Sequence, residues 1–252
     1  MKKAHSKDKY GNFFLCLLAV CFIFFNVSCG LDVLSVVLDD PVTDVTSLPN
    51  ITSSYENLHF TFETKQLDNA NDFGYGYVYY KIYNRSTSAE SEANNLIKIA
   101  TDENRKSASA SSMRDYGFKE LKLLPSSGKA TPLRFENESQ NIRIRLTTYD
   151  ASTSFRSIIA VDDVSMGTPL RCIDGTFDFK TAASTGEGTV FSDAAPQKGD
   201  EDAKNLSDTP PAPGVFYVSL FYVFMMYDDT YTPIYSPVHY LGTVRINADE
   251  RN

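Results

Sequence analysis

Gly214-Val-Phe-Tyr-Val-Ser-Leu-Phe-Tyr-Val-Phe-Met-Met226 is apolar at almost every position and rich in aromatic and β-branched residues. A strand that is covered on both faces has a continuous apolar run of this kind. At 13 residues the stretch is too short for a helix that crosses a bilayer, which needs about 20 residues. We therefore expect it to be the central strand of a sheet around which the domain is built.

Three other segments alternate with the period of a β-strand that has one buried face. Residues 56–64 place Leu58, Phe60, Phe62 and Thr64 on one side and His59, Thr61 and Glu63 on the other. Residues 73–84 place Tyr75, Tyr77, Tyr79, Lys81 and Tyr83 opposite Val78, Tyr80 and Ile82. Residues 141–149 direct Ile142, Ile144 and Leu146 inward and Arg143 and Arg145 towards solvent.

The row of tyrosines in residues 73–84 has two interpretations. Tyr75, Tyr77 and Tyr79 could form a surface on which a ligand stacks, or the half-buried face of a sandwich strand whose hydroxyl groups reach water. Tyrosine suits a half-buried β surface without any ligand, which favours the second interpretation. The first interpretation makes Tyr75, Tyr77 and Tyr79 the candidate binding surface of the chain.

The hydrophobic period changes to a helical one between residues 88 and 104, where the recurring residues are Ala89, Ala93, Leu96, Ile97 and Ala100. This spacing predicts an inserted amphipathic helix. The Ser-rich residues 105–112 predict a mobile loop, and residues 181–213, dense in Gly, Ser, Asp, Lys and Pro, predict a long surface loop. Because sandwiches carry recognition loops on a rigid frame, both are candidate regions for contact with a partner.

The first 28 residues have the features of a lipoprotein signal peptide. Four lysines precede an apolar run at residues 13–25, which at 13 residues is too short to span a bilayer. The small residues Ser28 and Gly30 flank Cys29, so a lipoprotein peptidase would leave Cys29 as the acylated N-terminus. Asn26 stands where the usual bacterial lipobox has Leu, and an ordinary signal peptide with an incidental cysteine is the alternative.

These features predict three parts of the chain. Residues 1–28 would be removed as the signal peptide, and residues 29–50 would form a tether attached to a membrane through lipid, such as palmitate, on Cys29. Residues 51–252 would form a single β-sandwich domain. The expected location is the cell envelope, in the outer membrane or on a membrane that faces the periplasm.

The charge and the cysteine content exclude two classes of protein. Removing the signal peptide, with four lysines and one aspartate, changes the net charge from −8 to −11, with 20 basic and 31 acidic residues left. This balance repels nucleic acid, which we exclude as a partner. Cys172 is the only cysteine after Cys29, so no disulfide within the domain is expected.

Motifs for catalysis or metal binding are missing from the sequence: it has no G-x-S-x-G, H-E-x-x-H, phosphate-loop or dinucleotide pattern. A nucleophilic Cys172 would need a histidine base, and His59 and His239 lie in separate strand-like segments. Asp228 and Asp229 are the best candidates for calcium, yet they lack the spacing of a calcium loop. We therefore expect a binding or structural module without metal or cofactor, and not an enzyme. The alternative is a lipoprotein enzyme whose active site is unidentified.

Two resemblances add to this picture. Cys29-Gly-Leu-Asp32 followed by Asp40-Pro41 resembles the start of treponemal (spirochaete) lipoproteins of uncharacterised function. The partner expected for a binding module is a protein or host ligand of unknown identity. Gly76-Tyr-Val-Tyr-Tyr80 and Tyr235-Ser-Pro-Val238 are similar to segments of fibronectin type III and wider immunoglobulin-like domains. This second resemblance implies an antiparallel β-sandwich, here with the helix inserted at about residues 88–104 and with long polar loops. Two successive sandwich modules are the alternative.

Overall fold

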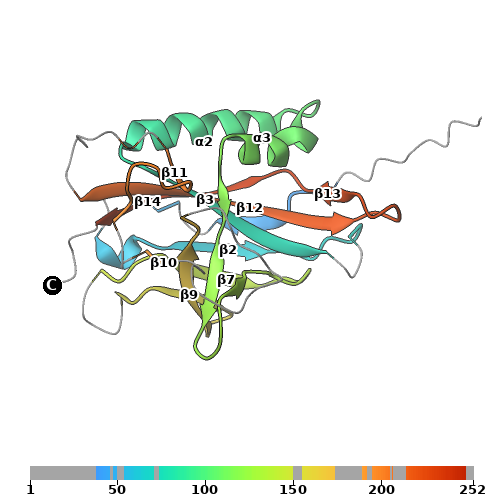
Figure 1. Cartoon of the computed structure of the whole chain (residues 1–252). Helices are drawn as coiled ribbons and strands as arrows, with labels where there is room; N and C mark the ends of the chain where they lie inside the picture. Colours follow the sequence, from blue (N-terminus) through green and yellow to red (C-terminus); the bar gives the residue numbers. More distant parts are fainter. Residues whose placement is uncertain are drawn as a thin grey trace, which may run out of the picture. The chain divides into compact units, whose positions relative to one another are not determined.

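The computed structural model describes residues 38–45, 48–49, 54–70, 74–149, 155–173, 189–191, 195–204, 206 and 214–247. All of these residues lie in one compact unit that runs from Val37 to Asn252. Two largely antiparallel sheets pack face to face, and two helices cover the outer face of one sheet (Figure 1). The fold is therefore a mainly β sandwich with a third, helical layer. The expected signal peptide and Cys29 lie outside the described residues.

The sheet beneath the helices, called the β12 sheet, is organised around β12 (Val215–Tyr227). On one side β12 pairs with β3 (Tyr75–Tyr83), and on the other with β14 (His239–Asn247) and β13 (Pro233–Tyr235). The short strands β4 (Lys119–Glu120) and β11 (Ala203–Lys204) pair with β3, and β11 is parallel to it. The expected central strand is confirmed, because β12 has paired neighbours on both sides and apolar clusters on both faces.

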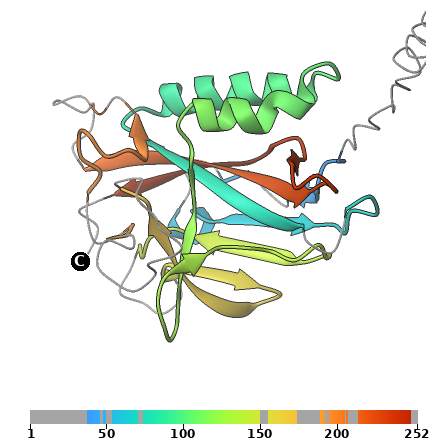
Figure 2. The ribbon, with the colours of Figure 1, turned by 45° about the vertical axis from the view of Figure 1, so that its right-hand side comes forward.

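The second sheet, called the β7 sheet, has the strand order β1-β2-β7-β8-β9-β5-β6, with β10 beside β9. Its strands are β1 (Val42–Val45), β2 (Phe60–Thr64), β5 (Lys122–Pro125), β6 (Thr131–Pro132), β7 (Asn141–Arg145), β8 (Ile158–Val161), β9 (Val164–Arg171) and β10 (Thr189–Val190). Figure 2 shows the chain passing from the helical layer through β4 and β5 into this sheet. The two sheets are thus connected along one edge by the chain itself.

The main core lies between the two sheets. Phe60 and Phe62 of β2, which pair with Ile144 and Ile142 of β7, share this core with inward side chains of β3 and β12. The rings of Phe62 and Tyr222 lie 5.4 Å apart. Each large apolar side chain buried here stabilises the fold by about 1.5–3 kcal/mol. Because strands from distant parts of the chain alternate in both sheets, the described residues form one sandwich and not two successive modules.

Gly76 on β3 allows a close approach inside this core. A Cβ atom at this position would lie 1.7 Å from the hydroxyl oxygen of Tyr222 on β12. The backbone of Gly76 also exchanges two hydrogen bonds with Phe135, at 2.8 and 3.0 Å. Any side chain at position 76 would therefore displace Tyr222 from the core.

The helical layer consists of α2 (Ser86–Thr101), the 3-10 turn η2 (Lys106–Ala108) and α3 (Ser109–Asp115). The helix expected at residues 88–104 thus begins two residues earlier and ends at Thr101. Leu96 of α2 and Met113 of α3 belong to one apolar cluster with Phe221 and Val223 of β12. This second core lies between the helices and the β12 sheet.

The prediction of a mobile Ser-rich loop at residues 105–112 is wrong, because η2 and α3 cover most of it. Ser109 is fully buried. Its hydroxyl donates a hydrogen bond to the Lys106 carbonyl at 2.6 Å and accepts one from the Val238 backbone N–H at 3.1 Å. Burial of the small side chains Ser109 and Ala110 against the β12 sheet favours a helix here despite the polar composition, so the segment is not a loop.

The expected domain start at residue 51 is corrected by β1, which lies inside the predicted tether. Val42 of β1 pairs with Thr64 of β2, and Leu38 is only 1% exposed. Because Leu38 and Val42 contribute apolar side chains to the domain, residues 38–45 belong to it. Any tether therefore ends before residue 38.

The prediction that Arg145 points into solvent is wrong, because its side chain is buried. The turn η1 (Tyr55–Asn57) lies over its side of the sheet, and the Arg145 guanidinium donates to the Glu56 carbonyl at 3.0 Å. The guanidinium also lies 5.3 Å from the ring of Phe155. The alternation of β7 was predicted correctly, but a neighbouring turn covers the outer face.

Candidate functional site

The tyrosine row of β3 faces the helical layer, on the side of the strand opposite Val78. Tyr77 is buried, with 7% of its surface exposed, while Tyr75 and Tyr79 are half-buried. Burial raises the pKa of Tyr79, and the nearby Glu120 carboxylate raises it further. The structure therefore places the three predicted residues in one row, of which Tyr75 and Tyr79 can reach a partner.

Two arginines extend this row into a larger surface. The guanidinium of Arg114, from α3, lies 4.7 Å from the ring centre of Tyr235 on β13 and donates a hydrogen bond to its hydroxyl at 3.1 Å. The guanidinium of Arg134 lies 5.4 Å from the ring centre of Tyr75. We call the set Tyr75, Tyr79, Tyr235, Arg114 and Arg134 the tyrosine–arginine surface.

Sequence reasoning found only the β3 part of the tyrosine–arginine surface. Arg114, Arg134 and Tyr235 come from three separate segments, and no local pattern marks any of them as part of a binding surface. Each arginine is exposed and lies against a ring, and a cation–π contact of this kind contributes about 0.5–1 kcal/mol towards holding it there. The two contacts therefore favour the arrangement in which both arginines cover the rings.

Glu120 lies beside this surface, opposite Tyr79 in the pairing of β3 with β4. Its Oε1 atom is buried without a hydrogen-bond partner among the described residues. Burial raises the pKa of the Glu120 carboxyl, although the charges of Lys122 and Arg134 act in the opposite direction. This oxygen is buried beneath the tyrosine–arginine surface, so a partner that binds above it would not reach it directly.

A buried ionic network ties part of the predicted loop 181–213 to the sandwich. Arg171 of β9, fully buried, donates to both carboxylate oxygens of Asp202 at 2.8 and 2.9 Å and to Asp200 at 2.8 Å. The Tyr80 hydroxyl donates to Asp202 at 2.7 Å and accepts from the Cys172 backbone N–H at 2.5 Å. The described residues 195–204 are thus anchored in the domain.

Residues that were considered for chemistry do not come together. Cys172 is buried with its sulfur 3.7 Å from Lys122 Nζ. His59 contacts the Glu56 carbonyl at 2.7 Å, and burial lowers its pKa, while His239 lies 2.8 Å from Asp40. Among the residues that the structure describes, neither His59 nor His239 forms a hydrogen bond with Cys172.

The Asp228 carboxylate accepts hydrogen bonds from the residues of the turn that follows it. It accepts hydrogen bonds from the Thr230 hydroxyl at 2.7 Å and from the backbone N–H groups of Thr230 and Thr232, each at 2.8 Å. These hydrogen bonds lower the pKa of Asp228, the Thr230 hydroxyl most strongly. Within the described parts of the chain, no group of three or more His, Cys, Asp or Glu side chains is arranged to hold a metal ion.

Comparison with known proteins identified no relative: no family model, no curated protein and no solved structure matches the chain. Among the described helices, none combines the length and the apolar character needed to cross a membrane.

Proposed function

We propose that this protein is a lipid-anchored lipoprotein of the cell envelope that binds a protein partner through the tyrosine–arginine surface. The observation that carries the proposal is the stacking of Arg114 on Tyr235 and of Arg134 on Tyr75 at the surface of a rigid sheet. Tyrosine and arginine are the residues most enriched at the energetic centres of protein interfaces. No catalytic residue is part of the proposal.

The rigidity of the tyrosine–arginine surface supports a binding role. Tyrosine presents a large contact area with few rotatable bonds, so little conformational entropy is lost when a partner binds. Tyr75 and Tyr79 are further fixed by the regular backbone of β3 and by the cluster around the buried Tyr77. A partner would add contacts to groups whose positions are already set.

The proposed anchor rests on the sequence of residues 1–32. The apolar run at 13–25, the small residues around Cys29 and the resemblance of Cys29-Gly-Leu-Asp32 to spirochaete lipoproteins support export and acylation. Stable attachment requires more than one acyl chain, since a single chain binds membranes only marginally. An anchored domain would present its binding surface to a neighbouring envelope protein or to a host protein.

We also propose that the sandwich is related to the immunoglobulin-like and fibronectin type III domains. Gly76-Tyr-Val-Tyr-Tyr80 on β3 and the Ser236-Pro237 pair before β14 support this relationship. The helical layer between β3 and β4 would then be an insertion into that frame. A crystal structure whose strand connections cannot be superimposed on such a domain would disprove the relationship.

Site-specific photo-crosslinking tests the binding role. A photoreactive phenylalanine analogue would replace Tyr235 in the full chain, in the cells that make it, and would replace the exposed Arg143 of the β7 sheet in a control. We expect one discrete protein adduct from position 235, none from position 143, and loss of the adduct on adding Arg114→Ala. Equal labelling at both positions, or none at either, would refute the proposed surface.

A separate experiment tests the anchor. Replacing Cys29 with Ala should abolish incorporation of labelled palmitate and release the protein from membranes into the soluble fraction. Palmitate that still enters the Cys29→Ala chain, or never enters the wild type, would show that the anchor assignment is wrong. A point variant that abolishes turnover of an ester, peptide or glycoside substrate would instead establish an enzyme.

A further inference from the structure

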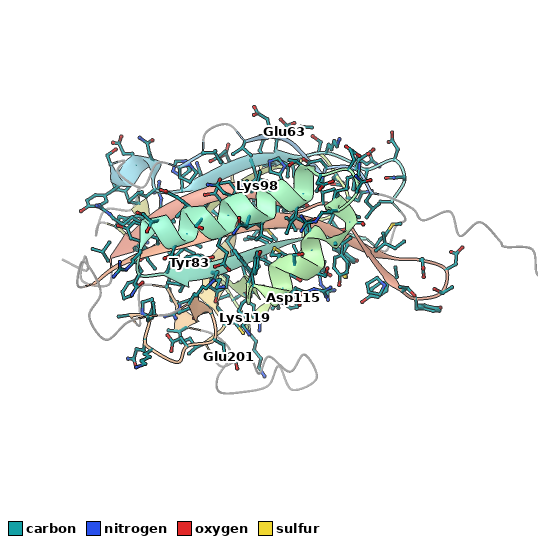
Figure 3. The ribbon with its side chains drawn as sticks, turned by 90° about the horizontal axis from the view of Figure 1, so that it is seen from above. Glu63, Tyr83, Lys98, Asp115, Lys119 and Glu201 are labelled. Atoms are coloured by element: carbon teal, nitrogen blue, oxygen red, sulfur yellow. The ribbon has the colours of Figure 1, made fainter. Side chains whose placement is uncertain are left out.

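A polar groove of about 440 Å³ lies beside the first half of α2, at the far end of β3 from Tyr75. It is lined by Asn84, Arg85, Thr87, Ser88, Ser91, Glu92, Asn95, Tyr116 and Lys204. Because β3 rises about 3.3 Å per residue, its start at Tyr75 and the groove residue Asn84 are about 30 Å apart along the strand. The groove is therefore distinct from the tyrosine–arginine surface. Figure 3 views α2 from above, with Tyr83 of β3 beside its first turns.

The floor of the groove is a satisfied ionic cluster. Glu92 of α2, 6% exposed, accepts from Lys81 of β3 at 2.7 Å and from Lys204 of β11 at 2.5 Å. Lys81 also donates to the carbonyl of Tyr116, which follows α3. The cluster joins both helical segments to two strands, so the groove has a fixed shape before any ligand enters.

The wall formed by α2 carries a stripe of hydrogen-bonding side chains. Ser88, Ser91 and Asn95 are exposed and follow the spacing of residues on one helix face. With a rise of 1.5 Å per residue, the stripe is about 10 Å long. All nine lining residues carry a polar side chain, and Tyr116 is the only aromatic ring among them. The groove therefore suits a ligand with several hydroxyl groups over that length.

The charge of the groove is opposite to that of the whole chain. Among the lining residues, Arg85 and Lys204 contribute two positive charges and Glu92 one negative charge, which gives +1 locally against −8 overall, and the buried Lys81 beneath the groove adds a further positive charge. Arg85 makes no ion pair within the described residues, so its charge is available to a ligand. A carboxylate in the groove would form charge-assisted hydrogen bonds there.

We propose that this groove binds an acidic carbohydrate, a uronic-acid oligosaccharide of about two sugar units. Such a ligand combines carboxylates, which Arg85 and Lys204 can bind, with hydroxyl groups that Ser88, Ser91 and Asn95 can bind. A single phosphate ion would leave most of the volume empty. The lining offers a peptide no apolar subsite for its side chains, whereas each of its residues can bind a hydroxyl group or a carboxylate.

Calorimetry with defined sugars tests the ligand class. The detergent-solubilised full-length protein would be titrated with digalacturonate, with its dimethyl ester and with inorganic phosphate. We expect digalacturonate to bind about tenfold or more tightly than the ester, as the loss of a charge-assisted hydrogen bond implies. The binding should weaken when NaCl rises from about 50 mM to about 500 mM. Equal binding of acid and ester, equal binding of phosphate, or no binding of digalacturonate would overturn the proposal.

Two variant pairs on α2 locate the site. Arg85→Ala and Ser91→Trp should each weaken digalacturonate binding by about tenfold or more, because one removes a charge and the other fills the groove. The matched controls Lys98→Ala and Asn94→Trp change exposed residues of the same helix that do not line the groove, and should bind as the wild type does. Wild-type affinity in both Arg85→Ala and Ser91→Trp would refute the location. Crosslinking from position 235 should be unchanged in Ser91→Trp, which separates this proposal from the proposed function.

Discussion

Replacing Asp202 with Asn tests whether the buried network holds residues 195–204 in place. The Asp202 side chain is 0% exposed and accepts three hydrogen bonds, two from Arg171 and one from Tyr80. The amide has nearly the same volume, but it removes the negative charge and presents N–H donors to the Arg171 donors. Breaking one partner of a buried ion pair costs about 3–5 kcal/mol. Since Asp200 still pairs with Arg171 at 2.8 Å, we expect a loss of about 3 kcal/mol.

Urea denaturation followed by tyrosine fluorescence measures this loss, since the chain has no tryptophan. Glu201→Gln is the matched control at the next position. Glu201 pairs with Lys119 at 2.7 Å in an exposed contact, visible in Figure 3, and such pairs contribute about 0–1 kcal/mol. A loss in Asp202→Asn no larger than that in Glu201→Gln would refute the reasoning. If Asp202→Asn does not fold, Tyr80→Phe, which removes the donor to Asp202 and the acceptor for the Cys172 backbone N–H, should still lose about 1–3 kcal/mol.

Three other predictions concern the whole domain. Phe221→Ala should lower the free energy of unfolding by about 3–5 kcal/mol, because Phe221 is fully buried. His59 is half-buried, so an equal loss in His59→Ala would contradict the assigned faces of the strands. Glu120→Gln should raise the melting temperature at pH 7. Burial raises the pKa of Glu120 in the folded state above its ordinary 4.5, because the buried site favours the neutral carboxyl. The stability that the protonated carboxyl contributes is therefore present below pH 4.5 and is lost as the pH rises through the folded-state pKa, whereas glutamine stays neutral. The increase in melting temperature of Glu120→Gln over the wild type should vanish near pH 4. An increase that is the same at pH 4 and pH 7 would show that the charge of Glu120 is not its cause. Chelator and reductant should leave the melting temperature unchanged, whereas a large drop with chelator would implicate Asp228 as a metal ligand.

The parts of the fold that follow from local period were predictable from the sequence. Side chains of a strand alternate between its two faces, so the apolar residues within 56–64 and 73–84 predict which face of each strand enters the core. The continuous apolar run at residues 214–226 required cover on both faces. The burial of Arg145 was not predictable, because it depends on a turn placed over β7 by the tertiary fold.

The candidate site was only partly predictable for the same reason. Tyr75 and Tyr79 stood out because they share a strand face, whereas Arg114 and Tyr235 are 121 residues apart and meet only in the folded domain. The Ser-rich segment misled the prediction because serine composition does not reveal that Ser109 is buried beneath the backbone of Val238. Contacts between distant segments therefore decide both the shape of the surface and what covers it.

The pairing of β3 with β12 also dictates when the domain can form during synthesis. Tyr83 pairs with Tyr217 and Tyr75 with Met225, so the edge of β3 that faces β12 has no partner until the residues of β12 have left the ribosome, although β4 can pair with the other edge earlier. Closing such long loops makes folding slow, on the order of milliseconds to seconds. Until then the chain exposes one unpaired edge of a tyrosine-rich strand, which invites aggregation. This exposure lasts from the synthesis of β3, which ends at Tyr83, to that of β12, which begins at Val215.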